Sequence, residues 1–103
     1  MIAPADGGVA DRMMDQLTAE VVDRLAATPY PRLREVMQAL VRHLHSLARE
    51  VRLTEAEWLA AIGFLTRTGQ KSDEVRQEFI LLSDTVGLSS LVEGLRLLSG
   101  MSA

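Results

Sequence analysis

Two histidines are the residues of this sequence best suited to chemistry, and they lie two positions apart, at His43 and His45. An imidazole can act as a general base or bind a metal near neutral pH. On a helix each residue turns by about 100°, so side chains two positions apart point in nearly opposite directions. Metal-binding histidines of one helix are three or four positions apart instead. We therefore expect no metal site and no cofactor.

His43 is the better candidate of the two. A helical wheel places it beside an apolar stripe, near Val36 and Leu47, and places His45 further toward water. Two interpretations of His43 stay open. It can be a structural residue at the edge of a core, which is the simpler one, or it can act as a general base or ligand contact in a small apolar pocket.

Four more residues are candidates for ligand binding or catalysis, each with a structural alternative. Glu57 follows Thr54 by three positions, the spacing of a capping box, and Trp58 can fill a core. Together, Glu57 and Trp58 could instead line a pocket. Tyr30 lies between two prolines on a stiff loop, where it can contact a ligand or plug one end of a bundle. Phe64 points away from the main apolar face of its helix and is a further ligand-binding candidate.

Apolar residues recur at helical spacing through most of the chain, and this predicts an all-α fold. Helices are expected at about 11–27, 31–51, 54–68, 73–86 and 89–98. The second has the clearest amphipathic pattern. Its apolar positions alternate steps of three and four: Leu33, Met37, Leu40, Leu44, Leu47 and Val51. Its opposite side is polar: Arg34, Gln38, Arg42, Ser46 and Arg49.

Local signals predict where these helices begin and end. Gly69 is expected as a left-handed cap, Asp73 as the start of the next helix, and Gly87 as a stop. We therefore expect a helical domain over 11–98, with flexible tails at 1–10 and 99–103. We expect a compact bundle of four or five helices. It should be dimeric, because the third and fourth helices carry apolar residues on more than one side.

Composition excludes several classes of protein. The 103 residues include 11 basic and 14 acidic side chains, without the basic stripe of a nucleic-acid-binding protein. Cysteine is absent, so disulfides and thiolate metal sites are excluded. No basic leader followed by an apolar run opens the sequence, and no apolar run is long enough to span a membrane. These features favour a cytoplasmic protein.

Several short segments share residues with one known family. They include Pro31-Arg32-Leu33-Arg34-Glu35, Arg42-His43-Leu44-His45, Glu57-Trp58, Phe64-Leu65-Thr66, Arg76-Gln77-Glu78-Phe79 and Leu81-Leu82-Ser83-Asp84. Over roughly 28–93, the sequence resembles the helical N-terminal domain of intradiol ring-cleaving dioxygenases, the hydroxyquinol and catechol 1,2-dioxygenases, without their catalytic domain. The hydroxyquinol branch is the most similar.

The resemblance implies an association role rather than ring cleavage by this chain. In that family, two tyrosines and two histidines of a β-rich C-terminal domain hold iron(III), whereas this chain has one tyrosine and two histidines. It cannot supply that site and is not a competent intradiol dioxygenase alone. The family's helical domain mediates dimerisation and lines an apolar tunnel that holds lipid tails.

Two hypotheses follow. The first is a homodimeric binding or assembly module of aromatic-compound metabolism, which encloses an apolar small molecule or lipid and can join a separate dioxygenase subunit. The alternative is a cofactor-free enzyme acting on an aromatic or polyketide-like substrate. Its candidate residues are His43, Tyr30, Glu57 and Trp58. The first is preferred, because no pair of residues in the sequence demands a catalytic explanation.

Overall fold

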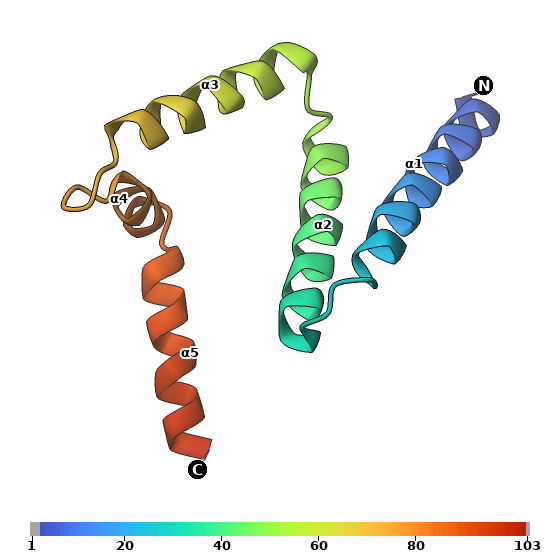
Figure 1. Cartoon of the computed structure of the whole chain (residues 1–103). Helices are drawn as coiled ribbons and strands as arrows, with labels where there is room; N and C mark the ends of the chain where they lie inside the picture. The colour runs from blue at the N-terminus through green and yellow to red at the C-terminus, as the bar shows by residue number, and fades with distance from the viewer. Residues whose placement is uncertain (1–2, 103) are drawn as a thin grey trace. The chain divides into compact units, whose positions relative to one another are not determined.

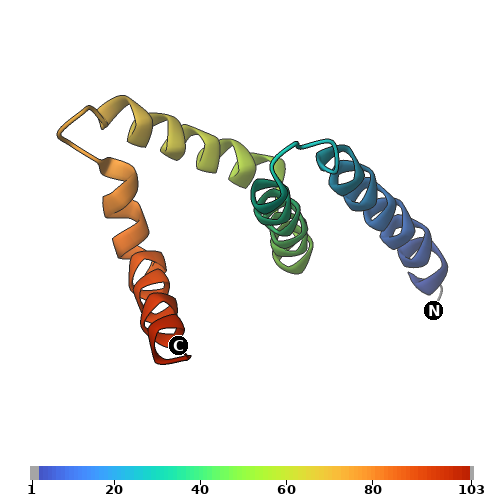
Figure 2. The same cartoon turned by 60° about the horizontal axis from the view of Figure 1, so that its bottom comes forward.

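The computed structural model describes residues 3–102, with side chains over 8–100, and its regular elements are all helices. In order they are α1 (Ala3–Leu25), α2 (Pro31–Val51), α3 (Glu55–Lys71), α4 (Glu78–Thr85) and α5 (Leu88–Ser102) (Figure 1, Figure 2). The all-α prediction, with five helices, is confirmed. Within this range no helix has the length and apolar character needed to cross a membrane.

The chain forms two units. The first contains α1 and α2 and ends at Leu53, and the second contains α3, α4 and α5 and begins at Thr54. In the first unit, α1 and α2 run in opposite directions on either side of a short turn (Figure 1). Among residues 8–100, Thr68 is the only buried residue, and neither unit buries an apolar side chain. Each unit therefore leaves apolar surface open.

The bounds of α2 are those predicted from the sequence. The helix begins at Pro31, where a proline costs nothing because the first helical amides have no partner within the helix. After Val51, the residue Arg52 adopts a left-handed conformation with φ 50°. The amide of Leu53 then donates to the carbonyl of Ala48 at 3.0 Å. This bond satisfies a carbonyl that the helix end would otherwise leave unpaired.

The helices at both ends of the chain are longer than expected. α1 begins at Ala3 rather than Asp11, and α5 continues to Ser102 rather than stopping near residue 98. The Gly- and Ala-rich start suggested a tail over 1–10, because glycine lowers helix stability by about 1 kcal/mol relative to alanine. The proline of α1, Pro4, falls in the first turn, where it is tolerated. Residues 1, 2 and 103 lie outside the described range.

α3 confirms the capping box but corrects the expected helix end. The Thr54 hydroxyl accepts from the Glu57 amide at 3.1 Å, and the Glu57 carboxylate accepts from the Thr54 amide at 2.9 Å. The prediction of Gly69 as a left-handed cap is wrong, because α3 continues beyond it. A Cβ on Gly69 would lie 3.7 Å from the ring of Phe79, so this position contacts α4. Gly87, with φ 81°, does have the left-handed backbone.

α4 is shorter than expected, because it begins at Glu78 and not at Asp73. The Asp73 carboxylate accepts from the amides of Arg76 and Val75 at 2.6 and 2.8 Å, and such local bonds compete with a helix. The same two bonds, that from Arg76 first, lower the pKa of Asp73. Val75 lies before α4 and is 93% exposed, so it does not extend the apolar surface of that helix.

Candidate functional site

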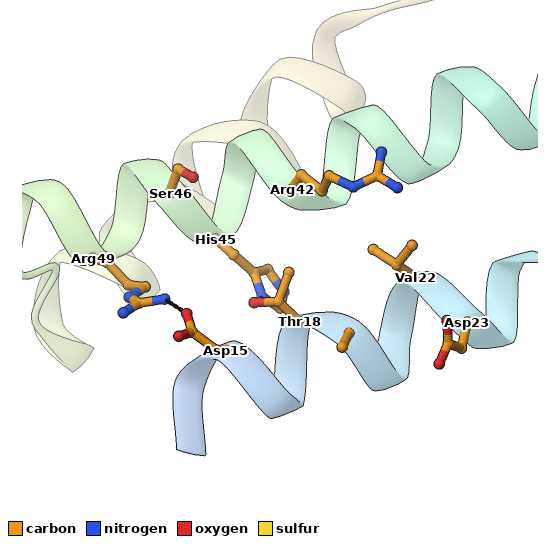
Figure 3. Close-up of a pocket in the computed structure, with 9 residues that line it drawn as sticks. Asp15, Thr18, Val22, Asp23, Arg42, His45, Ser46 and Arg49 are labelled. Atoms are coloured by element: carbon orange, nitrogen blue, oxygen red, sulfur yellow. Dashed lines mark hydrogen bonds and ion pairs between the residues drawn. The ribbon is translucent and has the colours of Figure 1, made fainter. Parts of the chain in front are cut away.

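α1 lies against the polar side of α2, and a groove of about 470 Å³ runs between the two helices (Figure 3). The residues lining it are Asp15, Thr18, Ala19, Val22 and Asp23 of α1, and Arg42, His45, Ser46 and Arg49 of α2. Most of these side chains are polar or charged. The groove therefore offers hydrogen-bonding and ionic contacts.

Thr18 and His45 join the two helices within this groove. The Thr18 hydroxyl oxygen and His45 Nδ1 are 2.6 Å apart, and the same hydroxyl donates to the carbonyl of Met14 at 3.1 Å. Which of the two groups donates in this bond depends on the tautomer of the His45 ring.

Arg49 connects the same side of α2 to two aspartates of α1. Its guanidinium lies 2.6 Å from Asp15 and 3.3 Å from Asp11. The hydrogen bond to Asp15 is the main cause that raises the pKa of Arg49 above its ordinary value, and the charges of both aspartates add to this. An arginine is already protonated at neutral pH, so this contact stays ionic over the whole physiological range.

Two bonds from side chains to backbone complete the contact between α1 and α2. The Gln38 amide donates to the carbonyl of Val22 in α1 at 2.9 Å, and the Arg34 guanidinium donates to the carbonyl of Thr28, in the turn after α1, at 3.4 Å. Polar residues of α2 thus hold α1 along much of its length. This is the side of α2 that the sequence pattern marked as solvent-facing.

The apolar stripe of α2 lies on the side that α1 does not cover. Leu40, Leu44 and Leu47 are 46%, 52% and 54% exposed, whereas the side chain of Arg49 is only 33% exposed. A charged residue of this helix is therefore better covered than its leucines. An extended apolar patch of this kind is typical of a surface that binds another molecule.

The two histidines are placed opposite to expectation. His45, expected toward water, is half-buried against α1 through its bond to Thr18, so that prediction is wrong. His43 is exposed, and its ring forms no hydrogen bond or ion pair within residues 8–100. A general-base role for His43 stays a prediction.

The other candidates lie in different parts of the two units. Tyr30 precedes α2 and is 69% exposed, and the carboxylate of Glu57 is engaged in the capping box. Trp58 and Phe64 are each about half exposed. Phe64 lines a second groove, of about 320 Å³ within the second unit, together with Leu81 of α4. Ligand binding by these four residues stays a prediction.

Pattern analysis missed the residues that form the α1–α2 groove. One pattern in the sequence does indicate part of this groove. Asp11 and Asp15 are four positions apart and share one side of a helix, and Arg49 lies on the polar side of the other helix. Opposite charges of this kind on two consecutive helices favour contact between those sides. The pairing of Thr18 with His45 has no comparable signal.

Comparison with known proteins identifies the family. Residues 30–96 match the family described as the catechol dioxygenase N terminus. The chain belongs to this family. Its match begins at residue 30, so α1 precedes it. The 6-chlorohydroxyquinol 1,2-dioxygenase of Cupriavidus pinatubonensis is 63% identical over 75 residues, which cover 73% of this chain and 27% of that protein.

Two further relatives show the same similarity to hydroxyquinol dioxygenases. The hydroxyquinol 1,2-dioxygenase of Nocardioides simplex is 60% identical over 73 residues, covering 71% of this chain and 25% of that enzyme. The crystal structure of the hydroxyquinol 1,2-dioxygenase of Pseudomonas putida DLL-E4 matches with a TM-score of 0.80 at 50% identity, covering 84% of this chain and 30% of that one. The chain therefore spans between a quarter and a third of each relative.

The residues present do not fit the iron site that the resemblance implies. That site needs two tyrosines and two histidines, and Tyr30 is the only tyrosine of this sequence. The two histidines cannot converge, because His45 bonds to α1 while His43 is exposed on α2. Among the described residues, no three His, Cys, Asp or Glu side chains are grouped to hold a metal. The family's iron chemistry cannot be assigned to these residues.

Proposed function

We propose that this chain is a helical association module of the hydroxyquinol-dioxygenase type, which forms a homodimer and encloses an apolar small molecule or lipid. The observation that carries the proposal is the open apolar stripe of α2, with α1 on the opposite side of the helix. Burial of apolar surface is favourable by about 25 cal/mol per Å². Burial of a second apolar surface against this stripe would therefore stabilise the contact strongly.

The second unit supports the proposal with apolar surface of its own. On α4, Ile80 and Leu81 are 56% and 58% exposed, and on α5, Leu91 and Leu95 are 61% and 55% exposed. Aliphatic side chains without nearby polar partners suit a flexible hydrocarbon better than a polar metabolite. This surface can serve either the contact between copies or the walls around an apolar ligand.

The relatives suggest where such a module acts. The relatives from Cupriavidus pinatubonensis and Nocardioides simplex are named as hydroxyquinol-type dioxygenases and are about four times as long as the matched part. The module would therefore serve aromatic-compound metabolism, and a separate dioxygenase subunit is the expected partner. A cysteine-free sequence suits the reducing cytoplasm, where we place it. No contact described above favours the alternative of a cofactor-free enzyme, since His43 and Tyr30 are both exposed.

Native mass spectrometry of the purified chain tests both parts of the proposal in one measurement. The expected result is the mass of two chains plus a retained small molecule that organic solvent extracts. A dimer without added mass would remove the enclosed ligand and keep the association role. A monomer at micromolar concentration, checked by sedimentation, would contradict the proposal.

A further inference from the structure

The apolar stripe of α2 repeats every seven residues. Its positions alternate steps of four and three along the whole helix: Leu33, Met37, Leu40, Leu44, Leu47 and Val51. A single α-helix turns in about 3.6 residues, so a stripe with an average step of about 3.5 stays on one side only when the helix winds around a second helix. The stripe is therefore suited to a helical partner of similar length.

The first unit leaves this stripe without a helical partner. α1 lies on the opposite side of α2, where it contacts His45 and Arg49. Five of the six stripe residues are between 46% and 54% exposed, and Met37 is half-buried. A second copy of the chain presents a stripe of the same length and spacing. A twofold-symmetric pair of copies brings the two equal stripes together and leaves each α1 outside.

The two ends of α2 differ in charge. At the N-terminal end, the first turn has no acidic side chain, and the backbone amides there carry the positive end of the helix dipole. Arg32 forms an ion pair with Glu35, which leaves Arg34 as an additional positive charge near this end. The N-terminal end of α2 is therefore net positive.

The C-terminal end of α2 carries the negative end of the helix dipole. Arg49 is paired with Asp15 of α1. Glu50 and Arg52 carry opposite charges two positions apart and add no net charge. A parallel pair of α2 helices would place two positive ends side by side, whereas an antiparallel pair places each positive end beside a negative one. Charge complementarity therefore favours the antiparallel orientation.

The register of such a pair follows from the stripe. When Leu33 of one copy lies level with Val51 of the other, all six apolar positions have a partner in the opposing helix. A shift by one repeat leaves two of the six without a partner. The midpoint between 33 and 51 is position 42, so the residues beside it lie next to the twofold axis. His43 borders the stripe there, and it would meet His43 of the second copy.

We propose that α2 pairs with α2 of a second copy as an antiparallel coiled coil whose two His43 side chains meet at the twofold axis, which makes the dimer weaker at mildly acidic pH. The inference rests on the proposed homodimer and adds its orientation and its response to pH. Histidine is the side chain that gains its charge between about pH 5 and 8. Two imidazolium groups side by side repel each other, so association is strongest where both rings are neutral and weakens as the pH falls.

Among residues 8–53, no acidic side chain lies beside His43 to offset this repulsion. On α2, its neighbours one turn away are uncharged: Ala39, Leu40, Ser46 and Leu47. The nearest carboxylate on the same edge of the stripe is that of Glu50, two turns further along in either copy. The aspartates of α1 are on the other side of the helix, where Arg42, His45 and Arg49 line the groove. The charge of the second copy that His43 meets is therefore that of the other His43.

Sedimentation equilibrium of the full chain at pH 8 and pH 5.5 tests the response to pH. The dimer should dissociate about tenfold more readily at pH 5.5, because two charges a few Å apart near a protein surface repel by at least this factor. His43→Gln, which stays neutral, should dissociate equally at both pH values. His45→Gln is the matched control on the α1 side of the same helix and should keep the tenfold ratio.

The outcomes separate this inference from the proposed dimer. A parent dimer that is equally stable at both pH values, or a tenfold ratio that persists in His43→Gln, would overturn the inference and leave the proposed homodimer in place. A monomer at pH 8 would contradict both.

Chemical cross-linking tests the orientation, and the cysteine-free chain is suited to it. With a short bismaleimide reagent, His43→Cys should give a covalent dimer, because position 43 meets itself at the axis. Leu33→Cys alone should not, because its two copies lie about 27 Å apart in an antiparallel pair, 18 residues at about 1.5 Å each. An equal mixture of Leu33→Cys and Val51→Cys should cross-link. A covalent dimer of Leu33→Cys alone would show a parallel pair and overturn the inference, as would a mixture that does not cross-link.

Discussion

The two sides of α2 differ in what they contact. On the polar side, the chain's own α1 is held by single directed bonds, such as the bond between Thr18 and His45 and the bond from Arg49 to Asp15. On the apolar side, Leu40, Leu44 and Leu47 remain about half exposed. An amphipathic helix is usually expected to turn its apolar side to its nearest neighbour. Here that neighbour is on the polar side.

The polar side of α2 determines how α1 is oriented, whereas the apolar side can supply the free energy of a larger contact. A hydrogen bond contributes only about 0.5–1.5 kcal/mol net but requires a definite geometry, so the polar side fixes how α1 lies along α2. Apolar burial is stronger and has little directionality. Within the first unit, α1 leaves the apolar side of α2 uncovered. This supports the proposed association through the stripe.

The largest effect is expected from a charge on the apolar stripe. Leu44→Asp would place a carboxylate in the proposed contact between copies, where burial without a partner is costly. We expect the dimer to dissociate at least about 100-fold more readily, as measured by sedimentation equilibrium. The hydrogen-exchange protection of α1 should stay unchanged, because Leu44 lies away from the groove.

Arg32→Asp is the matched control for this substitution. It introduces the same carboxylate into the same helix, at an exposed position whose ion pair within residues 8–100 is with Glu35. Its dimer should be as stable as the parent's, within about twofold. Equal dissociation of the two variants would show that the stripe has no special role, and the contrast between the two sides would then be lost.

Helix pattern alone predicts part of this arrangement. The bounds of α2 and the capping box of Thr54 and Glu57 follow from local rules, because proline at a helix start and reciprocal capping bonds depend only on nearby residues. The structural roles of Gly69 and Asp73 could not be predicted from such local rules. Gly69 lies in α3 beside the ring of Phe79, a contact from another helix, and Asp73 forms a local turn in place of a helix.

The groove between α1 and α2 could not be predicted from the sequence, for a related reason. A polar side chain such as that of His45 has the same pattern whether it faces water or another helix. Only the partner across the interface, Thr18, distinguishes the two, and the pair lies 27 positions apart in the chain. Residues of this kind are found from tertiary contacts, whereas the family could be recognised from short segments of sequence alone.

A smaller effect is expected on the polar side, at the contact between helices. Thr18→Val keeps the shape of the side chain but removes the hydroxyl that bonds to His45. The loss of about 1 kcal/mol should increase hydrogen exchange in α1 about fivefold. Thr85→Val is the control, since it removes a hydroxyl that donates to the Leu81 carbonyl of its own helix and, within residues 8–100, bonds to no other helix. Unchanged exchange in Thr18→Val would mean that this bond does not hold α1.

A weaker and salt-dependent effect is expected from the ion pairs. Arg49→Gln removes the contacts to Asp15 and Asp11, which lie at the surface and are screened by solvent. Exchange in α1 should increase at low salt by less than in Thr18→Val. At about 1 M NaCl the difference from the parent should disappear, because the screening length falls to about 3 Å. Arg32→Gln, which loses an exposed pair within α2, should leave α1 unchanged at either salt concentration.

The smallest effect is expected at His43, on the open side of α2. Its ring has no partner within residues 8–100, so His43→Ala should change the midpoint of fatty-acid binding by less than about twofold. The fluorescence of Trp58, the single tryptophan, is the readout. Under the enzyme alternative, the same variant would lower turnover of an aromatic substrate by about 100-fold while binding survives. A parent protein whose fluorescence shows no saturable response to lipids or aromatics would remove the apolar ligand from the proposal.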